Sequence, residues 1–287
     1  MVEGCRDAIH FADVVAMVEH EPEVIMPVLL DRWELTDFSH EGATKPVYRR
    51  GAGPGVIVIH EVPGITPPVA SFAERVVDRG FTVFMPSLFG TVGKEKTVPY
   101  AIESAVRACI SREFTCLATG APSPITGWLR HLARQAHDEL GGPGVGAVGM
   151  CLTGGFALAM MVDDTIAAPV LSQPATPFPI GRRRAAALAL SESDWQRVES
   201  RVAAGCPVLG LRFSDDPAVP AARFRTLADR LGDGFLAVEI DSSPGNEFGI
   251  KKSAHSVLTE DLVDEPGHPT RHALDHVLDF LEDRLLV

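Results

Sequence analysis

The segment GVGAVGMCLTGG, residues 144–155, places one cysteine between two runs of different character. The apolar run 145–150 is typical of a buried strand, and the residues after it predict a helix from 152 to about 162. Cys151 therefore falls at the turn between them, where the helix dipole favours a thiolate and lowers the thiol pKa. Because small neighbours permit a sharp turn, the segment predicts a nucleophile flanked by glycines at 149, 154 and 155.

The same segment matches the dinucleotide-binding pattern G-x-G-x-x-G through Gly144, Gly146 and Gly149. That pattern needs a strand that ends directly before its first glycine, so that the pyrophosphate meets the next helix. Here HDELGGP (137–143) precedes the first glycine and is typical of a helix end and a turn. We therefore interpret the segment as a nucleophile turn, and we predict no cofactor.

A base and an acid are expected after the nucleophile, because strand–nucleophile–helix turns occur in folds with the order nucleophile, acid, histidine. The predicted strand 207–213 is followed by SDDPAVP, which holds Asp215 and Asp216. His255 lies between the last predicted strand, 235–240, and the closing helix, so it is the candidate base. Either aspartate could instead form a turn before Pro217.

Glu61 directly follows the apolar strand predicted over 56–60, which would place its carboxylate at the carboxyl edge of the sheet, beside Cys151. A structural role, accepting from an arginine or a backbone donor, is the alternative. His268, His272 and His276 are spaced by four, as metal ligands on a helix can be. No carboxylate or cysteine set accompanies them, so we predict a surface stripe and no metal site.

The elements that must position these residues alternate along the chain. Strands are predicted at 33–38, 46–50, 55–60, 81–90, 145–150, 166–172, 207–213 and 235–240, with helices at 67–80, 152–162, 193–204, 221–232 and 271–286. Repeated βα units predict an α/β fold with a doubly wound, mostly parallel sheet and helices on both faces. We expect this domain over 33–287, preceded by an N-terminal helical extension over 1–32 with a helix near 6–20.

Composition narrows the function classes. The chain has 287 residues and a net charge of −12, which argues against nucleic acid as a partner. No apolar run approaches the roughly 20 residues that span a bilayer, and the N-terminus lacks the apolar core of a signal peptide. Five cysteines without a C-x-x-C pair favour free thiols in the cytoplasm. The expected partner is a small molecule, and the oligomeric state is left open.

VIVIHEVPGI (56–65), FTVFMPSLFG (81–90), GMCLTGGFAL (149–158) and DDPAVP (215–220) together resemble the dienelactone hydrolase family of α/β-hydrolases. The resemblance runs from about residue 33 to the end and implies Cys151 as nucleophile. It places the acid in a D-x-x-V-P segment, which favours Asp216 over Asp215. It also implies that Glu61 pairs with the thiol and helps to ionise it. The fold takes one oxyanion donor after each of two strands, here the N–H groups of Val62 and Leu152.

Two positions depart from the family pattern. Thr153 displaces the usual glycine pair by one residue, and its side chain is expected to reshape the pocket. Thr91 stands where the family usually has an arginine for the substrate carboxylate, with Lys94 and Lys96 as the nearest cationic substitutes. We therefore expect a neutral or weakly charged ester or lactone as substrate, and not a carboxylated dienelactone.

The sequence thus predicts a hydrolase that cleaves a small ester or lactone through a Cys151–His255–Asp216 triad and a covalent thioester. Two alternatives stay open at this point. The same triad could serve an acyltransferase or thioesterase, or the chain could be a catalytically silent α/β-hydrolase that acts as a binding module.

Overall fold

The computed structural model describes residues 30–110, 124–176, 186–188 and 190–286, and the side chains of this range except those of 108–110. The helix predicted near 6–20 lies outside the described residues, as does most of the extension predicted over 1–32.

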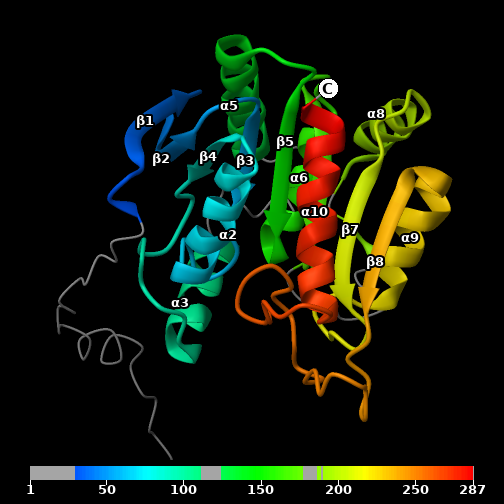
Figure 1. Ribbon diagram of the computed structural model, residues 1–287. Coiled ribbons are helices and arrows are strands. Elements are labelled where there is room, and N and C mark those ends of the chain that lie inside the picture. The colour runs from blue at the N-terminus through cyan, green and yellow to red at the C-terminus, as the bar shows by residue number, and fades with distance from the viewer. Residues whose placement is uncertain (1–29, 111–123, 177–185, 189, 287) are drawn as a thin grey trace, which may run out of the picture.

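Within the described residues, eight strands form one sheet in the order β1-β2-β4-β3-β5-β6-β7-β8 (Figure 1). The first two strands form an antiparallel hairpin at one edge, and β2 is also antiparallel to β4. The other neighbouring pairs are parallel. The bounds are β1 (Glu34–His40), β2 (Ala43–Gly51), β3 (Gly55–Ile59), β4 (Thr82–Pro86), β5 (Val145–Met150), β6 (Ile166–Ser172), β7 (Val208–Phe213) and β8 (Phe235–Ile240).

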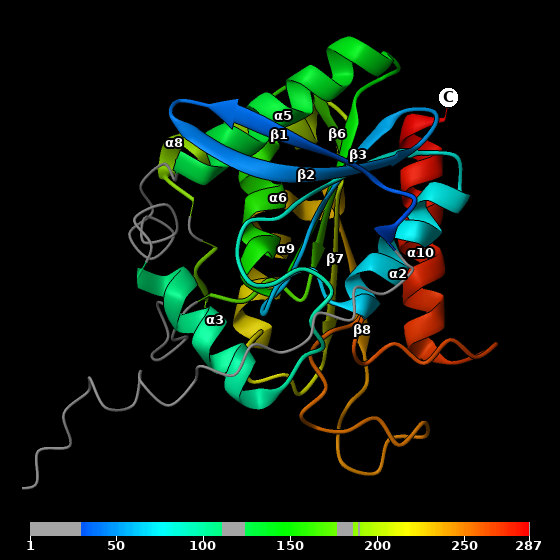
Figure 2. The ribbon, with the colours of Figure 1, turned by 90° about the vertical axis from the view of Figure 1, so that its left-hand side faces the viewer.

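The central strands have continuous apolar sequences because helices cover both of their faces. Every residue of β3, β4, β5, β6 and β7 is buried. Helices α2 (Pro67–Asp78) and α10 (Pro269–Leu285) pack on one face (Figure 2). The other face is covered by α5 (Pro124–Leu140), α6 (Gly154–Met160), α8 (Glu192–Ala203) and α9 (Ala221–Leu231). The predicted fold class, a doubly wound and mostly parallel α/β sheet, is confirmed.

Several predicted elements differ in their bounds. The strand predicted over 81–90 ends at Pro86: the Ser87 N–H still donates to the Pro46 carbonyl of β2, whereas the Leu88 N–H donates to the His60 side chain. The helix predicted from 152 begins as a 3-10 turn, η3 (Cys151–Thr153), and α6 ends at Met160. Helix α3 (Val98–Ile110) lies between β4 and α5.

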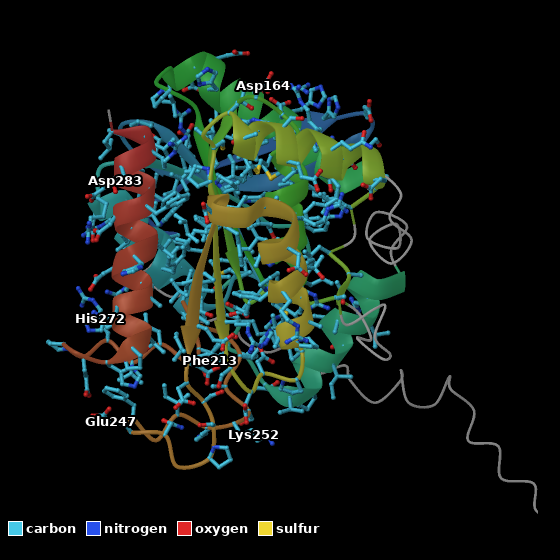
Figure 3. The ribbon with its side chains drawn as sticks, turned by 90° about the vertical axis from the view of Figure 1, so that its right-hand side faces the viewer. Asp164, Phe213, Glu247, Lys252, His272 and Asp283 are labelled. Carbon is cyan, nitrogen blue, oxygen red and sulfur yellow. The ribbon has the colours of Figure 1, made fainter. Side chains whose placement is uncertain are left out.

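The parallel strands bring their carboxyl ends to one end of the molecule. Figure 3 shows Phe213, the last residue of β7, at the same end as Lys252 and Glu247 of the loop that follows β8. Asp164, which precedes β6, lies at the opposite end (Figure 3). Ligands of open α/β sheets bind outside the carboxyl ends of the strands, so this end is where a site is expected. Among the described residues, no helix combines the length and apolarity needed to cross a bilayer.

Candidate active site

Cys151 occupies the turn between β5 and η3, at the carboxyl edge of the sheet. Its φ angle is 54°, in the left-handed region that non-glycine residues rarely adopt. Its carbonyl accepts a hydrogen bond of 2.8 Å from the Ala175 N–H, so the turn is tied to the segment after β6. The side chain is half-buried. A strained turn that presents a partly exposed thiol at a helix start is the geometry of an activated nucleophile.

Two glycines make this turn possible. A Cβ at Gly149 would lie 2.3 Å from the Thr153 carbonyl oxygen, and one at Gly154 would lie 2.7 Å from Pro174 Cα. Real Cβ atoms do not approach backbone so closely, so both positions require glycine. At Gly155 an added Cβ would meet one backbone oxygen at an ordinary 3.6 Å. The sequence attributed the room at the turn to all three glycines, whereas the structure requires only the first two.

A pocket of about 470 Å³ opens over Cys151. One side of it is formed by the nucleophile turn and by residues that follow β3 and β6. The opposite side belongs to residues 96–105, most of which are in α3. Among the described residues its lining consists of Val62, Lys96, Thr97, Val98, Ala101, Ile102, Ala105, Cys151, Leu152, Ala175 and Thr176. The pocket is therefore mainly apolar, with one charged side chain among these.

His255 reaches Cys151 from the loop between β8 and α10. Its Nδ1 donates to Asp216 Oδ2 at 2.6 Å, which leaves Nε2 for the thiol. Asp216 is buried, and its other carboxylate oxygen accepts from the Ala218 N–H at 2.8 Å. The structure thus brings Cys151, His255 and Asp216 together from three segments that are far apart in the sequence.

The electrostatics of this group favour a charged imidazole. Burial lowers the pKa of His255, but the charge of Cys151 and the hydrogen bonds to Asp216 and Cys151 raise it by more. The net result is a pKa well above the ordinary value of histidine. A charged imidazole beside a cysteine, oriented by a buried carboxylate, is an arrangement that suits a cysteine nucleophile.

The two neighbouring aspartates have different surroundings. Asp215 does not contact His255. Its carboxylate is one-third exposed and lies 4.0 Å from the Lys252 ammonium, while its N–H donates to Ser242 Oγ. Geometry therefore favours Asp216 as the acid, in line with the D-x-x-V-P pattern.

Asp261 holds the loop that carries His255. One of its carboxylate oxygens accepts from the N–H groups of both His255 and Ser256, each at 2.9 Å. The Asp261 N–H in turn donates to the Ser256 carbonyl. Asp261 was not predicted from the sequence; an aspartate a few positions after a histidine in a turn-rich segment is the signal that could have indicated it.

Glu61 is buried and joins the end of β3 to the same loop. Its carboxylate accepts hydrogen bonds from the hydroxyls of Ser256, at 2.7 Å, and Thr259, and from Gln173 Nε2 at 3.3 Å. Within the described part of the chain it makes no hydrogen bond to Cys151. Neutral donors thus satisfy this carboxylate, and its pairing with the thiol stays a prediction.

His60, which the sequence analysis did not single out, precedes Glu61 and is fully buried. Its Nε2 accepts from the Leu88 N–H at 3.0 Å, so Nδ1 must carry the proton that it shares with the Glu61 carbonyl at 3.0 Å. Burial is the main cause that lowers its pKa to about 4, with a smaller lowering from the charge of Lys45. A neutral imidazole therefore links the segment after β3 to the segment after β4.

Val62 and Leu152, the predicted oxyanion donors, both line the pocket beside Cys151. The N–H of Val62 donates to no other described group, and Leu152 lies in the first turn of η3, where N–H groups have no partner within the helix. Their role as oxyanion donors stays a prediction.

Comparisons with known proteins agree with this geometry. The model of the dienelactone hydrolase family matches residues 43–283. The chain belongs to this family. A comparison with curated proteins gives no significant match.

Solved structures with similar folds come from several sources. A dienelactone hydrolase from Anabaena variabilis ATCC 29413 is 17% identical, with a TM-score of 0.55 over 88% of this chain and 98% of that one. A cold-adapted esterase from an Arctic intertidal metagenomic library is 16% identical, with a TM-score of 0.56 over 88% and 94%. A Klebsiella pneumoniae protein provisionally assigned as a dienelactone hydrolase is 17% identical, with a TM-score of 0.57 over 86% and 97%. At these identities the likeness shows the α/β-hydrolase fold.

Thr153, a departure from the family pattern, does not face the pocket. Its side chain is fully buried, and its hydroxyl accepts from the Met150 N–H at 2.9 Å. The same oxygen lies 2.8 Å from the Met150 carbonyl, 2.9 Å from that of Ile59 and 3.2 Å from that of His60. The expectation that Thr153 reshapes the pocket is therefore wrong, because these backbone groups hold its hydroxyl at the junction of β5 and β3.

Thr91, the other departure, is engaged through its backbone. Its N–H donates to the Tyr100 hydroxyl at 2.5 Å, and that hydroxyl lies 3.3 Å from its carbonyl. The Lys94 ammonium lies 4.2 Å from the centre of the Tyr100 ring, in a cation–π contact. Of the two lysines predicted as substitutes for the family arginine, only Lys96 lines the pocket.

Arg223 of α9 is a third residue that was not predicted from the sequence. Its buried guanidinium donates to the Pro174 carbonyl and to Thr176 Oγ1, each at 2.7 Å, and so supports the pocket wall from behind. Burial lowers its pKa to about 10, and the charges of Asp216 and Cys151 oppose that shift. Arg223 is therefore a permanent cation on the nucleophile side of the pocket.

The histidine series on the last helix divides into two kinds. His272 and His276 are exposed, as predicted for a surface stripe. His268 is buried, and its ring accepts a hydrogen bond from the Thr270 N–H as the N-cap of α10. The prediction that His268 belongs to the surface stripe is therefore wrong. In the part of the chain that the structure describes, no group of histidine, cysteine and acidic side chains could hold a metal ion.

Proposed function

We propose that the protein hydrolyses a neutral ester or lactone, with Cys151 as nucleophile, His255 as proton carrier and Asp216 as the group that orients it. The observation that carries this proposal is the arrangement of a cysteine at φ 54° with a histidine that donates to a buried aspartate at 2.6 Å, beneath an apolar pocket. The membership of the dienelactone hydrolase family supports it.

The reaction proceeds in two halves. Cys151 Sγ attacks the carbonyl carbon, and the electron pair of the carbonyl bond moves to oxygen, where the N–H groups of Val62 and Leu152 stabilise the charge. The carbonyl re-forms, the C–O bond to the alcohol breaks, and the His255 imidazolium gives its Nε2 proton to the leaving oxygen. A thioester on Cys151 remains.

Water completes the reaction. Neutral His255 takes a proton from water as it attacks the thioester, and the second oxyanion collapses with cleavage of the C–S bond. The products are the acid and a restored thiolate–imidazolium pair. Asp216 keeps Nδ1 protonated throughout, so that Nε2 always faces the reacting atoms.

Turnover of a chromogenic ester, combined with thiol mapping, tests the proposal. Cys151→Ala is expected to lower kcat/KM by about 10³ or more. Brief treatment with iodoacetamide should label Cys151 before any other cysteine, and the fraction of turnover lost should equal the fraction of Cys151 that is labelled. Cys206 is the internal control, because it is buried and its pKa is raised by burial.

Three results would contradict the proposal. Cys206 could be labelled sooner than Cys151, Cys151→Ala could retain turnover, or Cys151 could react rapidly in a protein that turns over no ester. The last result would favour the binding-module alternative.

A further inference from the structure

The pocket wall opposite Cys151 is the first half of α3. Val98, Ala101, Ile102 and Ala105 all line the pocket. Their spacing places them along one side of the helix. Two alanines leave room between the larger Val98 and Ile102, so the helix presents an apolar groove about as long as two of its turns.

The orientation of α3 is fixed by its other side. Tyr100 is buried, and its hydroxyl is bonded to the backbone of Thr91. Ser104, one turn later, is buried as well. Because these residues face inward, Val98 and Ile102 remain 75% and 60% exposed, although they are large and apolar. Exposed aliphatic side chains on the wall of a pocket are typical of a surface that an apolar ligand covers.

The single charged residue of the described lining does not favour an anionic ligand. Lys96 interacts electrostatically with Glu260. Burial raises the pKa of Glu260, and the positive charge of Lys96 opposes that shift by favouring the carboxylate. Glu61 acts on Glu260 as well, as a like charge. A carboxylate tail that approached Lys96 would therefore meet a cation that already interacts with one carboxylate, that of Glu260.

We infer that the preferred substrates are esters with an unbranched apolar chain, which lies along the Val98–Ala105 side of α3. This inference rests on the proposed hydrolysis at Cys151. The eight residues from Val98 to Ala105 span about 10 Å, because seven rises of about 1.5 Å separate the first from the last, and this length corresponds to an extended chain of about eight carbons. The chain can belong to the acyl group or to the alcohol, and two substrate series distinguish these.

The experiment measures kcat/KM for 4-nitrophenyl acetate, butyrate, hexanoate and octanoate, and for acetates of alcohols of the same lengths. One of the two series is expected to rise about threefold for each added methylene, as apolar burial predicts. Ile102→Ser should lower kcat/KM for the longest member of that series about tenfold relative to kcat/KM for the acetate.

Val106→Ser is the matched control. Val106 is 54% exposed on the same helix, one turn beyond Ile102, but it does not line the pocket. Both changes affect exposed positions, so both variants should fold. Val106→Ser is expected to leave both substrate series unchanged within about twofold.

A flat dependence on chain length in both series would overturn the inference, as would equal effects of the two serine variants. A preference for 4-nitrophenyl hemisuccinate that is lost in Lys96→Met would also overturn it, in favour of charge recognition. Failure of the proposed function has a different signature: no ester is hydrolysed at all, or Cys151→Ala hydrolyses acetate as fast as the wild type.

A second inference rests on Thr153 alone. Its hydroxyl contacts backbone groups of Met150, just before the nucleophile, and of Ile59 and His60, just before the oxyanion segment. The geometry points to Thr153 as a positioning residue that sets the distance between Cys151 and the Val62 N–H. This inference depends on the oxyanion role proposed for Val62.

Thr153→Val keeps the shape and removes the hydroxyl. We expect kcat for ester hydrolysis to fall about tenfold with KM within about twofold, while the rate of Cys151 alkylation by iodoacetamide stays unchanged, because alkylation needs the thiolate and no oxyanion donor. Thr153→Ser should restore kcat, and Thr153→Ala serves in place of valine if that variant unfolds. The inference is wrong if alkylation falls with kcat, if serine is as defective as valine, or if kcat does not change.

Discussion

His60 directly follows β3, His255 lies in the loop between β8 and α10, and the pKa values of the two are shifted in opposite directions. His60, on the oxyanion side, is fixed between two backbone groups, and burial lowers its pKa to about 4. His255, on the base side, is also deeply set, yet the charges and hydrogen bonds of Cys151 and Asp216 outweigh burial and raise its pKa. One side chain type is thus held neutral in one place and favoured as a cation in the other.

The contrast extends to the segments around each histidine. The oxyanion side is positioned by backbone packing, in which Gly149 and Gly154 leave no space for a Cβ and Thr153 bonds only to backbone groups. The base side lies on a loop held by carboxylates, namely those of Asp216, Asp261 and Glu61. The first side should therefore be sensitive to added volume, and the second to lost charge.

The largest expected effect tests the charges of the base side. Asp216→Asn should lower kcat/KM by about 10² to 10⁴, because the amide no longer holds His255 in the correct tautomer. Asp215→Asn is the matched control, since its carboxylate lies near exposed Lys252, and it should change kcat/KM by less than about threefold. Steady-state kinetics on one chromogenic ester measures kcat/KM for both variants. Equal losses of kcat/KM would contradict the assignment of Asp216 as the acid in preference to Asp215.

Added volume tests the oxyanion side. Gly149→Ala should destabilise the fold by roughly 4 kcal/mol or more, because its Cβ would lie 2.3 Å from backbone that cannot move freely. Gly155→Ala, six residues later, meets nothing closer than 3.6 Å and should cost less than about 1 kcal/mol. Urea unfolding of the two variants measures both values. Similar losses of stability in the two variants would show that the close approach of backbone at Gly149 does not restrict side-chain volume there.

Most of the framework was predictable from the sequence, because fully buried parallel strands leave continuous apolar runs. Strands 145–150, 166–172 and 235–240 have the predicted bounds. The nucleophile turn could be placed because it joins such a strand to a helix through glycines. The strand predicted over 81–90 was too long, because the apolar residues after Pro86 belong to a buried loop instead of the sheet.

The groups that orient the site were less predictable. Asp261, Gln173 and Arg223 act through tertiary hydrogen bonds to residues distant in sequence or to a loop backbone, and such contacts leave no periodic pattern. The direction of the Thr153 hydroxyl was mispredicted for the same reason: its partners include the end of β3, more than 90 residues away. Residue type indicates which hydrogen bonds are possible, whereas the fold decides which are made.

The neutral histidine gives a pH-dependent loss of stability on the acid side. The pKa of His60 falls from an ordinary value near 6.5 to about 4 on folding, so the unfolded chain binds a proton more readily between these values. The free energy of unfolding should therefore fall by about 3 kcal/mol from pH 6.5 to pH 4 through this residue. His60→Gln keeps an acceptor for the Leu88 N–H but cannot be protonated. In urea titrations its free energy of unfolding should therefore fall by about 3 kcal/mol less than that of the wild type between pH 6.5 and pH 4. Parallel losses in the two proteins would contradict a buried neutral imidazole.

The charged histidine gives the opposite slope. A folded-state pKa raised above the unfolded value contributes stability that is fully present below about pH 6.5 and is lost as the pH rises through the folded value. The free energy of unfolding of the wild type minus that of His255→Gln should therefore be largest near pH 6 and decrease toward pH 9. Urea titrations of both proteins at these pH values measure the difference, and Cys151→Ala should flatten it, since the thiolate is a main cause of the raised pKa. A difference that grows with pH would mean that burial dominates at His255 as it does at His60, and that the base side holds no imidazolium.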